Sequence, residues 1–138
     1  MTVKHVIGTA ITTIMTTALN SLADGSESSA STEVDNRTNL DLVADFEFVM
    51  ASIGTGSRDG DILLYATYEV DGTNYSDDRH LIGIFKTNDA GNGARRCIIK
   101  DVPLRPHPTT YYIQNECGLQ LASSGNTLKI ITSNVQDV

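Results

Sequence analysis

The side chains of this chain that could bind a metal or transfer a proton are few and dispersed. The three histidines stand far apart, at His5, His80 and His107. None of them has a second His or a Cys at the spacing of a zinc site. Cys97 and Cys117 form no C-x-x-C motif, and each falls on a segment with the composition of a strand. The sequence therefore predicts no metal site and two buried free thiols, although a cross-strand contact between the cysteines stays open.

The acidic residues are the second group with chemical potential. Asp41, Asp45 and Glu47 could supply paired carboxylates for glycosidic cleavage, but their alternation is typical of the solvated face of a strand. The loop acids at 59–61 and 77–78 could offer oxygens to Ca²⁺, yet neither follows EF-hand spacing, and we interpret them as solubilising charges. The chain also has no G-x-S-x-G nucleophile motif. We expect a protein that is not an enzyme and holds no cofactor.

Composition limits the class of protein further. The chain has 138 residues, 40% of them hydrophobic, and 17 Asp and Glu against 10 Lys and Arg, for a net charge of −7. This length suits one domain with its own core. The negative charge argues against nucleic acid and against a polybasic membrane anchor as partners. Threonines interrupt the apolar residues near the N-terminus, which makes a poor signal peptide, and no apolar run approaches the ~18 residues that span a bilayer.

The elements that must position these side chains are mostly strands. In residues 40–50 the apolar side chains alternate with acids, so Leu40, Leu42, Ala44, Phe46, Phe48 and Met50 are expected to face the core. Similar patterns predict strands at 62–70, 81–86, 96–102, 109–117 and 127–135, with a weak one at 119–122. Turn residues separate them, and with only one doubtful helix there are too few crossover helices for a parallel sheet. We predict an all-β protein, an antiparallel β-sandwich of the jelly-roll kind with seven or eight strands.

The N-terminal segment allows two interpretations. Residues 10–23 carry apolar side chains at helical spacing, but their β-branched threonines disfavour a helix. A short helix is favoured here, and an extended arm that orders against a neighbour stays open. Residues 24–33 are rich in serine and are expected to form a loop or an exposed edge strand. The predicted organisation is an arm or short helix over residues 1–23, followed by a sandwich over residues 24–138.

A few residues are candidates for an interface. Adjacent Tyr111 and Tyr112 point to opposite faces of a strand, and tyrosine is enriched at interfaces, although a tyrosine that closes the rim of the sandwich explains the pair equally well. The apolar side chains of the arm are the other candidates. The interface candidates are Ile7, Ile11, Ile14, Met15, Tyr111 and Tyr112.

A series of short motifs supports a family resemblance. In chain order they are Ala-Leu-Asn-Ser-Leu-Ala-Asp-Gly (18–25), Val-Asp-Asn (34–36), Thr-Asn-Leu (38–40), Asp-Gly-Thr-Asn-Tyr (71–75) and Ala-Ser-Ser-Gly-Asn-Thr-Leu-Lys-Ile (122–130). Their order along the chain resembles that of small virion structural proteins of tailed bacteriophages. The resemblance covers most of residues 18–133 and carries over no catalytic residue.

The resemblance implies a non-enzymatic part of the virion. It favours a capsid decoration or cement protein, made in the host cytoplasm, located on the capsid surface and often trimeric. Its partners would be the major capsid protein or other virion proteins, and we expect residues 1–23 to contact the shell or an adjacent subunit. A tail, neck or fibre component is the first alternative. A carbohydrate-binding β-sandwich is the second, weakened because the chain has no Trp for stacking on sugars.

Overall fold

A computed structural model of the chain describes residues 3–88 and 91–137, with the side chains of residues 11–88 and 91–134. The regular secondary structure of the described chain is almost entirely strand. These are β1 (Val3–Met15), β2 (Val43–Met50), β3 (Ile62–Tyr68), β4 (His80–Phe85), β5 (Arg95–Pro103), β6 (Thr109–Asn115) and β7 (Thr127–Asp137), with one 3₁₀ turn, η1 (Thr17–Leu19). The predicted all-β class is confirmed. The weak strand predicted at 119–122 is wrong, because the Asn115 side chain donates to the Leu119 carbonyl (2.9 Å) and holds this segment as a loop.

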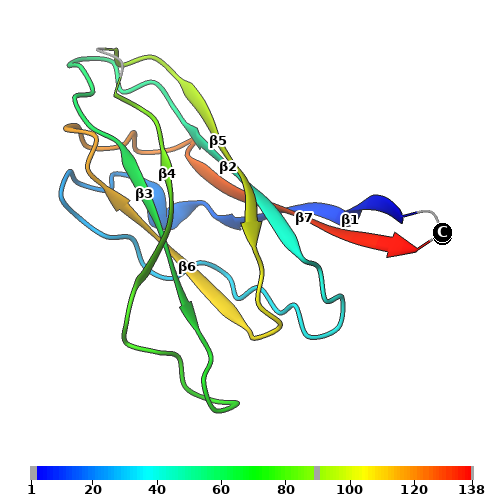
Figure 1. The fold of residues 1–138 in the computed structure, drawn as a ribbon. Coiled ribbons are helices and arrows are strands. Elements are labelled where there is room, and N and C mark those ends of the chain that lie inside the picture. Colours follow the sequence, from blue (N-terminus) through cyan, green and yellow to red (C-terminus); the bar gives the residue numbers. More distant parts are fainter. Residues whose placement is uncertain (1–2, 89–90, 138) are drawn as a thin grey trace.

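The strands form two antiparallel sheets that face each other (Figure 1). The first sheet has the order β1-β7-β2-β5 and the second has the order β4-β3-β6. Aromatic rings join them across the core: Phe46 meets Tyr111 with ring centroids 4.9 Å apart, and Phe48 meets Phe85 at 5.4 Å. Because side chains of both sheets fill the same core, the predicted sandwich is confirmed.

A serine-rich segment completes the second sheet. Residues 25–34 run along β6, where Ser28 N donates to Ile113 O (2.8 Å) and Ser31 N donates to Tyr111 O (2.9 Å). In return the hydroxyls of Ser28 and Ser31 accept hydrogen bonds from the backbone N–H groups of Ile113 and Tyr111. With this edge segment placed between β1 and β2, every connection crosses from one sheet to the other except the one between β3 and β4. That order of strands is a jelly roll.

Strand β2 supplies the centre of the core. Its buried residues are Ala44, Phe46, Phe48 and Met50, so this part of the predicted register is confirmed. The prediction was wrong for Leu40 and Leu42, which are 55% and 54% exposed. The Asn36 side chain exchanges two hydrogen bonds with the backbone of Asp41 (both 2.8 Å), and Leu40 adopts a φ of +51°. This turn delays the start of the strand to Val43.

The N-terminal segment is a strand and not the predicted short helix over residues 10–23. Threonines and isoleucines favour extended backbone, and β7 offers it a long antiparallel partner, with Ile11 opposite Ile131. Only η1 retains a helical turn. Ile14, Met15 and Leu19 are buried in the core of the sandwich. The segment is therefore extended, as in the second interpretation, but the strand that it pairs with is β7 of the same chain and not a neighbour.

The difference in exposure between Ile14 and Ile11 predicts how much each side chain of β1 contributes to the free energy of unfolding. Ile14 is 3% exposed and Ile11 is 64% exposed. We expect Ile14→Ala to lower the free energy of unfolding by about 2–5 kcal/mol, because it leaves a cavity in the core. Ile11→Ala, the matched control, should change it by about 0.5 kcal/mol or less. Urea denaturation measures both, and equally small effects would show that β1 is dispensable for the sandwich.

Candidate assembly interface

The first strand lies at an open edge of its sheet. β7 pairs with one side of β1 along nearly its whole length, from Val3 opposite Asp137 to Met15 opposite Leu128. On the other side, among the described residues, one backbone hydrogen bond is found, from Thr32 N to Ile14 O (2.9 Å). The remaining N–H and C=O groups on that side of β1 have no strand beside them in the described chain. Such a row of backbone groups is a template for another strand.

Part of this edge stands clear of the sandwich. β2 pairs with β7 only as far as Ser133, whereas β1 and β7 continue together to Val3 and Asp137. Figure 1 shows this two-stranded ribbon, blue and red, running past the ends of the other strands. A ribbon of two strands is marginally stable in water by itself. A third strand beside it would add backbone hydrogen bonds that the protein alone cannot make.

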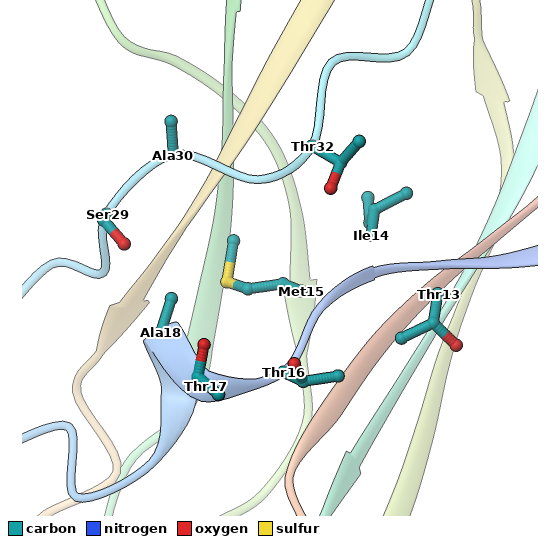
Figure 2. A pocket seen from close by; sticks show the side chains of 9 residues that line it. All are labelled: Thr13, Ile14, Met15, Thr16, Thr17, Ala18, Ser29, Ala30 and Thr32. Atoms are coloured by element: carbon teal, nitrogen blue, oxygen red, sulfur yellow. The ribbon is translucent and has the colours of Figure 1, made fainter.

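A shallow groove accompanies the inner end of this edge. It has a volume of about 240 Å³ and lies between the end of β1 with η1 on one side and residues 29–32 on the other (Figure 2). Its lining consists mostly of small and hydroxyl-bearing side chains, among them Thr13, Thr16 and Thr17, together with Ile14 and Met15. A second recess of about 220 Å³ adjoins Ile14 and Thr32 as well and includes the acids of residues 33–41. Together they leave the β1 side of the sandwich open.

The interface candidates on β1 fall into three situations. Ile11 is exposed, as an interface residue must be. Ile14 and Met15 are 3% and 4% exposed and belong to the core of their own chain, so they are not available to a partner. Ile7 lies in β1 opposite Ser133, and its side chain falls outside the described residues. Of the arm residues singled out from the sequence, only Ile11 is shown at the surface.

The two tyrosines lie on opposite faces of β6. Tyr111 is 2% exposed, and its burial raises its pKa above the ordinary value. Tyr112 faces outward, where the guanidinium of Arg79 sits 3.7 Å from its ring centroid. Arg79 is held there by Glu27, whose Oε1 accepts from its Nε at 3.2 Å. Tyr112 is therefore the only one of the pair that can meet a partner, and one face of its ring is already covered.

Other exposed apolar residues were missed from the sequence. Leu81 and Ile84 on β4 are 52% and 42% exposed, and Ile98 on β5 is 55% exposed. In a regular strand Leu81 and Ile84 would point to opposite faces. The pairing of β4 with β3 shifts register between Gly83 and Leu81, and both side chains are exposed, which alternation alone could not predict.

Three of the acids considered for catalysis or cation binding, Asp45, Glu47 and Asp61, have structural partners. Glu47 Oε2 lies 3.2 Å from Arg96 Nη1, and its other oxygen lies 4.0 Å from Lys129 Nζ. Asp45 accepts a hydrogen bond from the backbone N–H of Asp101 (2.9 Å), which steadies an irregularity at the edge of β5. Within the described residues no group of three or more His, Cys, Asp or Glu is placed to hold a metal ion.

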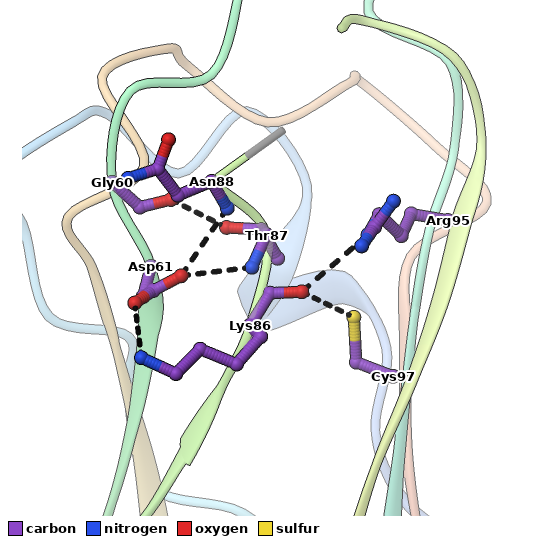
Figure 3. A network of polar contacts seen from close by, with 7 residues as sticks. All are labelled: Gly60, Asp61, Lys86, Thr87, Asn88, Arg95 and Cys97. Carbon is purple, nitrogen blue, oxygen red and sulfur yellow. Dashed lines mark hydrogen bonds and ion pairs between the residues drawn. The ribbon is translucent and has the colours of Figure 1, made fainter. Parts of the chain in front are cut away.

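Asp61 is the most connected of the loop acids (Figure 3). Its carboxylate accepts hydrogen bonds from the backbone N–H groups of Thr87 (2.9 Å) and Asn88 (3.2 Å) and pairs with Lys86 Nζ (3.2 Å). Burial alone would raise the pKa of Asp61, but these donors outweigh it and hold the pKa below its ordinary value. Asp61 therefore fastens the start of β3 to the segment that follows β4.

The cysteines are free and buried, as predicted. Cys97 Sγ donates to Lys86 O and Cys117 Sγ donates to Leu119 O, each at 3.3 Å. Burial raises the pKa of the Cys117 thiol above its ordinary value. Neither thiol is suited to nucleophilic or redox chemistry in the folded protein, because the reactive species is the exposed thiolate.

The comparisons with known proteins bring no assignment to this interface. No protein-family model matches the chain, and no curated protein is significantly similar to it. Across the described residues, the structure has no helix with the length and apolar character needed to cross a membrane.

The Asp61 contacts predict a pH dependence of stability. A carboxylate whose pKa is lower in the folded than in the unfolded protein stabilises the fold above the unfolded value of about 3.9, and this contribution disappears as the pH falls through the folded pKa. Asp61→Asn should lower the free energy of unfolding by about 1–3 kcal/mol at neutral pH and by less in acid. Lys86→Gln, which leaves the two N–H donors in place, should lower it by about 1 kcal/mol at most. A loss for Asp61→Asn that stays constant from neutral pH to pH 2 would contradict the assignment.

The buried thiols predict slow modification. A thiol reagent of ordinary size should react with neither Cys97 nor Cys117 in the folded protein, and with both once the chain is unfolded in guanidinium. Absorbance of the released chromophore counts the reacted thiols. Rapid reaction of either cysteine without denaturant would show that its side chain is accessible.

Proposed function

We propose that this chain is a non-enzymatic structural protein of a bacteriophage particle, a decoration or cement protein that assembles on the capsid shell. The observation that carries the proposal is the ribbon of β1 and β7, which extends beyond the sandwich with one backbone edge open. The motifs between residues 18 and 133 support it through their resemblance to small virion proteins. The fold supports it by analogy only, because jelly rolls are common in capsids and are also found in lectins and enzymes.

An open strand edge can hold a small protein on a lattice. Backbone pairing at a strand edge supplies directional hydrogen bonds without a deep pocket, and neighbouring side chains then provide specificity. The open side of β1 has this character and includes the exposed Ile11. The partner would be the shell or an adjacent copy of the chain, in line with the contact expected for residues 1–23 from the sequence.

The contacts of the tyrosine rings argue against the carbohydrate-binding alternative. Sugar stacking needs a free aromatic face, and this chain has no Trp. Arg79 covers one face of Tyr112. Tyr68 contacts both Arg105, at 4.9 Å from the ring centroid, and His80, with ring centroids 5.5 Å apart. These rings are used within the protein, so they make poor platforms for a sugar.

The shell-binding role predicts the effect of a short deletion. Removing all of residues 1–23 would take Ile14, Met15 and Leu19 out of the core, so the informative change is deletion of residues 2–10 alone. We expect this variant to keep the cooperative unfolding of the sandwich and to lose most of its binding to particles that lack the protein. Co-sedimentation with such particles measures the binding, and unchanged occupancy would contradict the role assigned to the ribbon.

The place in the particle follows from a count of copies. Quantitative mass spectrometry of purified particles should find this protein in numbers comparable to those of the shell protein. A few copies at a single vertex would assign it to the tail, neck or fibre instead. Its absence from the particles would overturn the virion assignment as a whole.

A further inference from the structure

The open side of β1 differs from the other sheet edges, which are obstructed. At β5 the pairing with β2 shifts register between Ala44 and Phe46, Asp101 has a φ of +57°, and Pro103 ends the strand. Bulges, charged residues and prolines of this kind prevent further pairing. The β4 edge approaches β5, where Cys97 Sγ donates to the carbonyl of Lys86. β1 has no proline and no acid along its thirteen residues. Its pairing with β7 shifts register between Ile7 and Ile11 and between Thr13 and Met15, and Lys4 is its one Lys or Arg.

The edge of the second sheet on the same side of the sandwich is the 25–34 segment. It is held to β6 by scattered backbone bonds and by the hydroxyls of Ser28 and Ser31, so it offers no regular row of donors and acceptors. One of its N–H groups, that of Thr32, is already used by Ile14 O. β1 is therefore the longest edge that the described chain leaves available, and it pairs regularly with β7 over residues 3–7 and 11–13.

Charge indicates what can approach this edge. All 17 acidic residues lie at Asp24 or beyond, while the first 23 residues contain Lys4 and no acid. Two copies of a protein with a net charge of −7 repel each other over most of their surfaces. Contact through β1 places the two acid-free segments next to each other, with Glu33, Asp35 and Asp41 beside the inner end of the strand and Asp137 opposite Val3. A second copy is thus electrostatically most compatible with the part of the strand that lies between these acids.

Symmetry makes a second copy a geometric match as well. Two identical strands that run antiparallel are related by a twofold axis, so each donor on one meets an acceptor on the other in the same register. The outer part of the ribbon would then change from two strands to four. Four strands form a more stable sheet than an isolated ribbon does.

We propose that two copies of this chain pair through the open edges of β1, antiparallel and about a twofold axis, to form one continuous sheet of eight strands from two four-stranded sheets. This inference deepens the proposed assembly role, because it names the partner of the ribbon as the chain itself. It predicts an even number of subunits, in contrast to the trimer implied by the family resemblance.

The mass in solution gives the first test. Sedimentation equilibrium of the full chain at neutral pH should give a dimer, and Ile11→Lys, which adds a cation to the paired strand of each copy, should weaken the dimer by about tenfold or more. Ile98→Lys is the matched control, because Ile98 is similarly exposed on the same sheet but on β5. A monomer or a trimer, or equal effects of the two substitutions, would overturn the proposal.

Cross-linking gives the second test and locates the axis. Single cysteines placed at Thr9, Ile11 and Thr13 should oxidise to disulfide-linked dimers most readily at one of these positions and less at the others, because residues pair with their own copies only near a twofold axis. Ile98→Cys should not cross-link, and Cys97 and Cys117 are buried. Uniform cross-linking along β1, or as much at Ile98→Cys, would contradict the pairing.

The two proposals can fail separately. Dimers that do not bind particles would leave the pairing intact and refute the virion role. Particle binding by a chain that is monomeric in solution and on the particle would refute the pairing and leave the virion role standing.

Discussion

The structure depends on how the backbone groups of β1 are satisfied. On one side β7 supplies an antiparallel partner, and this pairing brings Ile14 and Met15 into the core. On the other side the described chain supplies a single bond, from Thr32 to Ile14. Backbone polar groups that find neither a protein partner nor water destabilise a fold, so an open edge remains wet or acquires another strand. This asymmetry makes the same strand both part of the sandwich and its most available surface.

The rest of the sandwich provides a rigid support for that strand. Phe46 and Phe48 on β2 contact Tyr111 and Phe85 of the opposite sheet, which sets the spacing of the two sheets. β7 lies between β2 and β1 and transmits this order to the edge. Asp61 fixes the connection after β4 at the far side of the molecule. A strand attached to such a support is ordered before it binds, which lowers the entropic penalty of binding another strand.

Much of this fold could be predicted from local sequence, and the exceptions have non-local causes. The alternation from Ala44 to Met50 predicted β2 correctly, because a shift by one residue would have exposed two phenylalanines. The spacing of Ile11, Ile14 and Met15 also fits a helix, and only the presence of β7 decides for a strand. The alternation predicts Leu40 in the core, but the Asn36 side chain bonds to the backbone of Asp41 and closes a turn there, which leaves Leu40 exposed. For the interface, the sequence indicated apolar residues on the arm. Only the structure shows that Ile11 is exposed and available to a partner, whereas Ile14 is buried in the core.

The most direct measurement of the central claim is amide hydrogen exchange along β1. In an antiparallel edge strand, alternate N–H groups face β7 and the others face solvent, so half of them should exchange quickly in a lone molecule. If a second copy pairs with this edge, both sets of amides near the twofold axis are protected in concentrated solution, and the outward set loses protection on dilution. Outward amides that exchange quickly at every concentration, and also in assembled particles, would contradict the account.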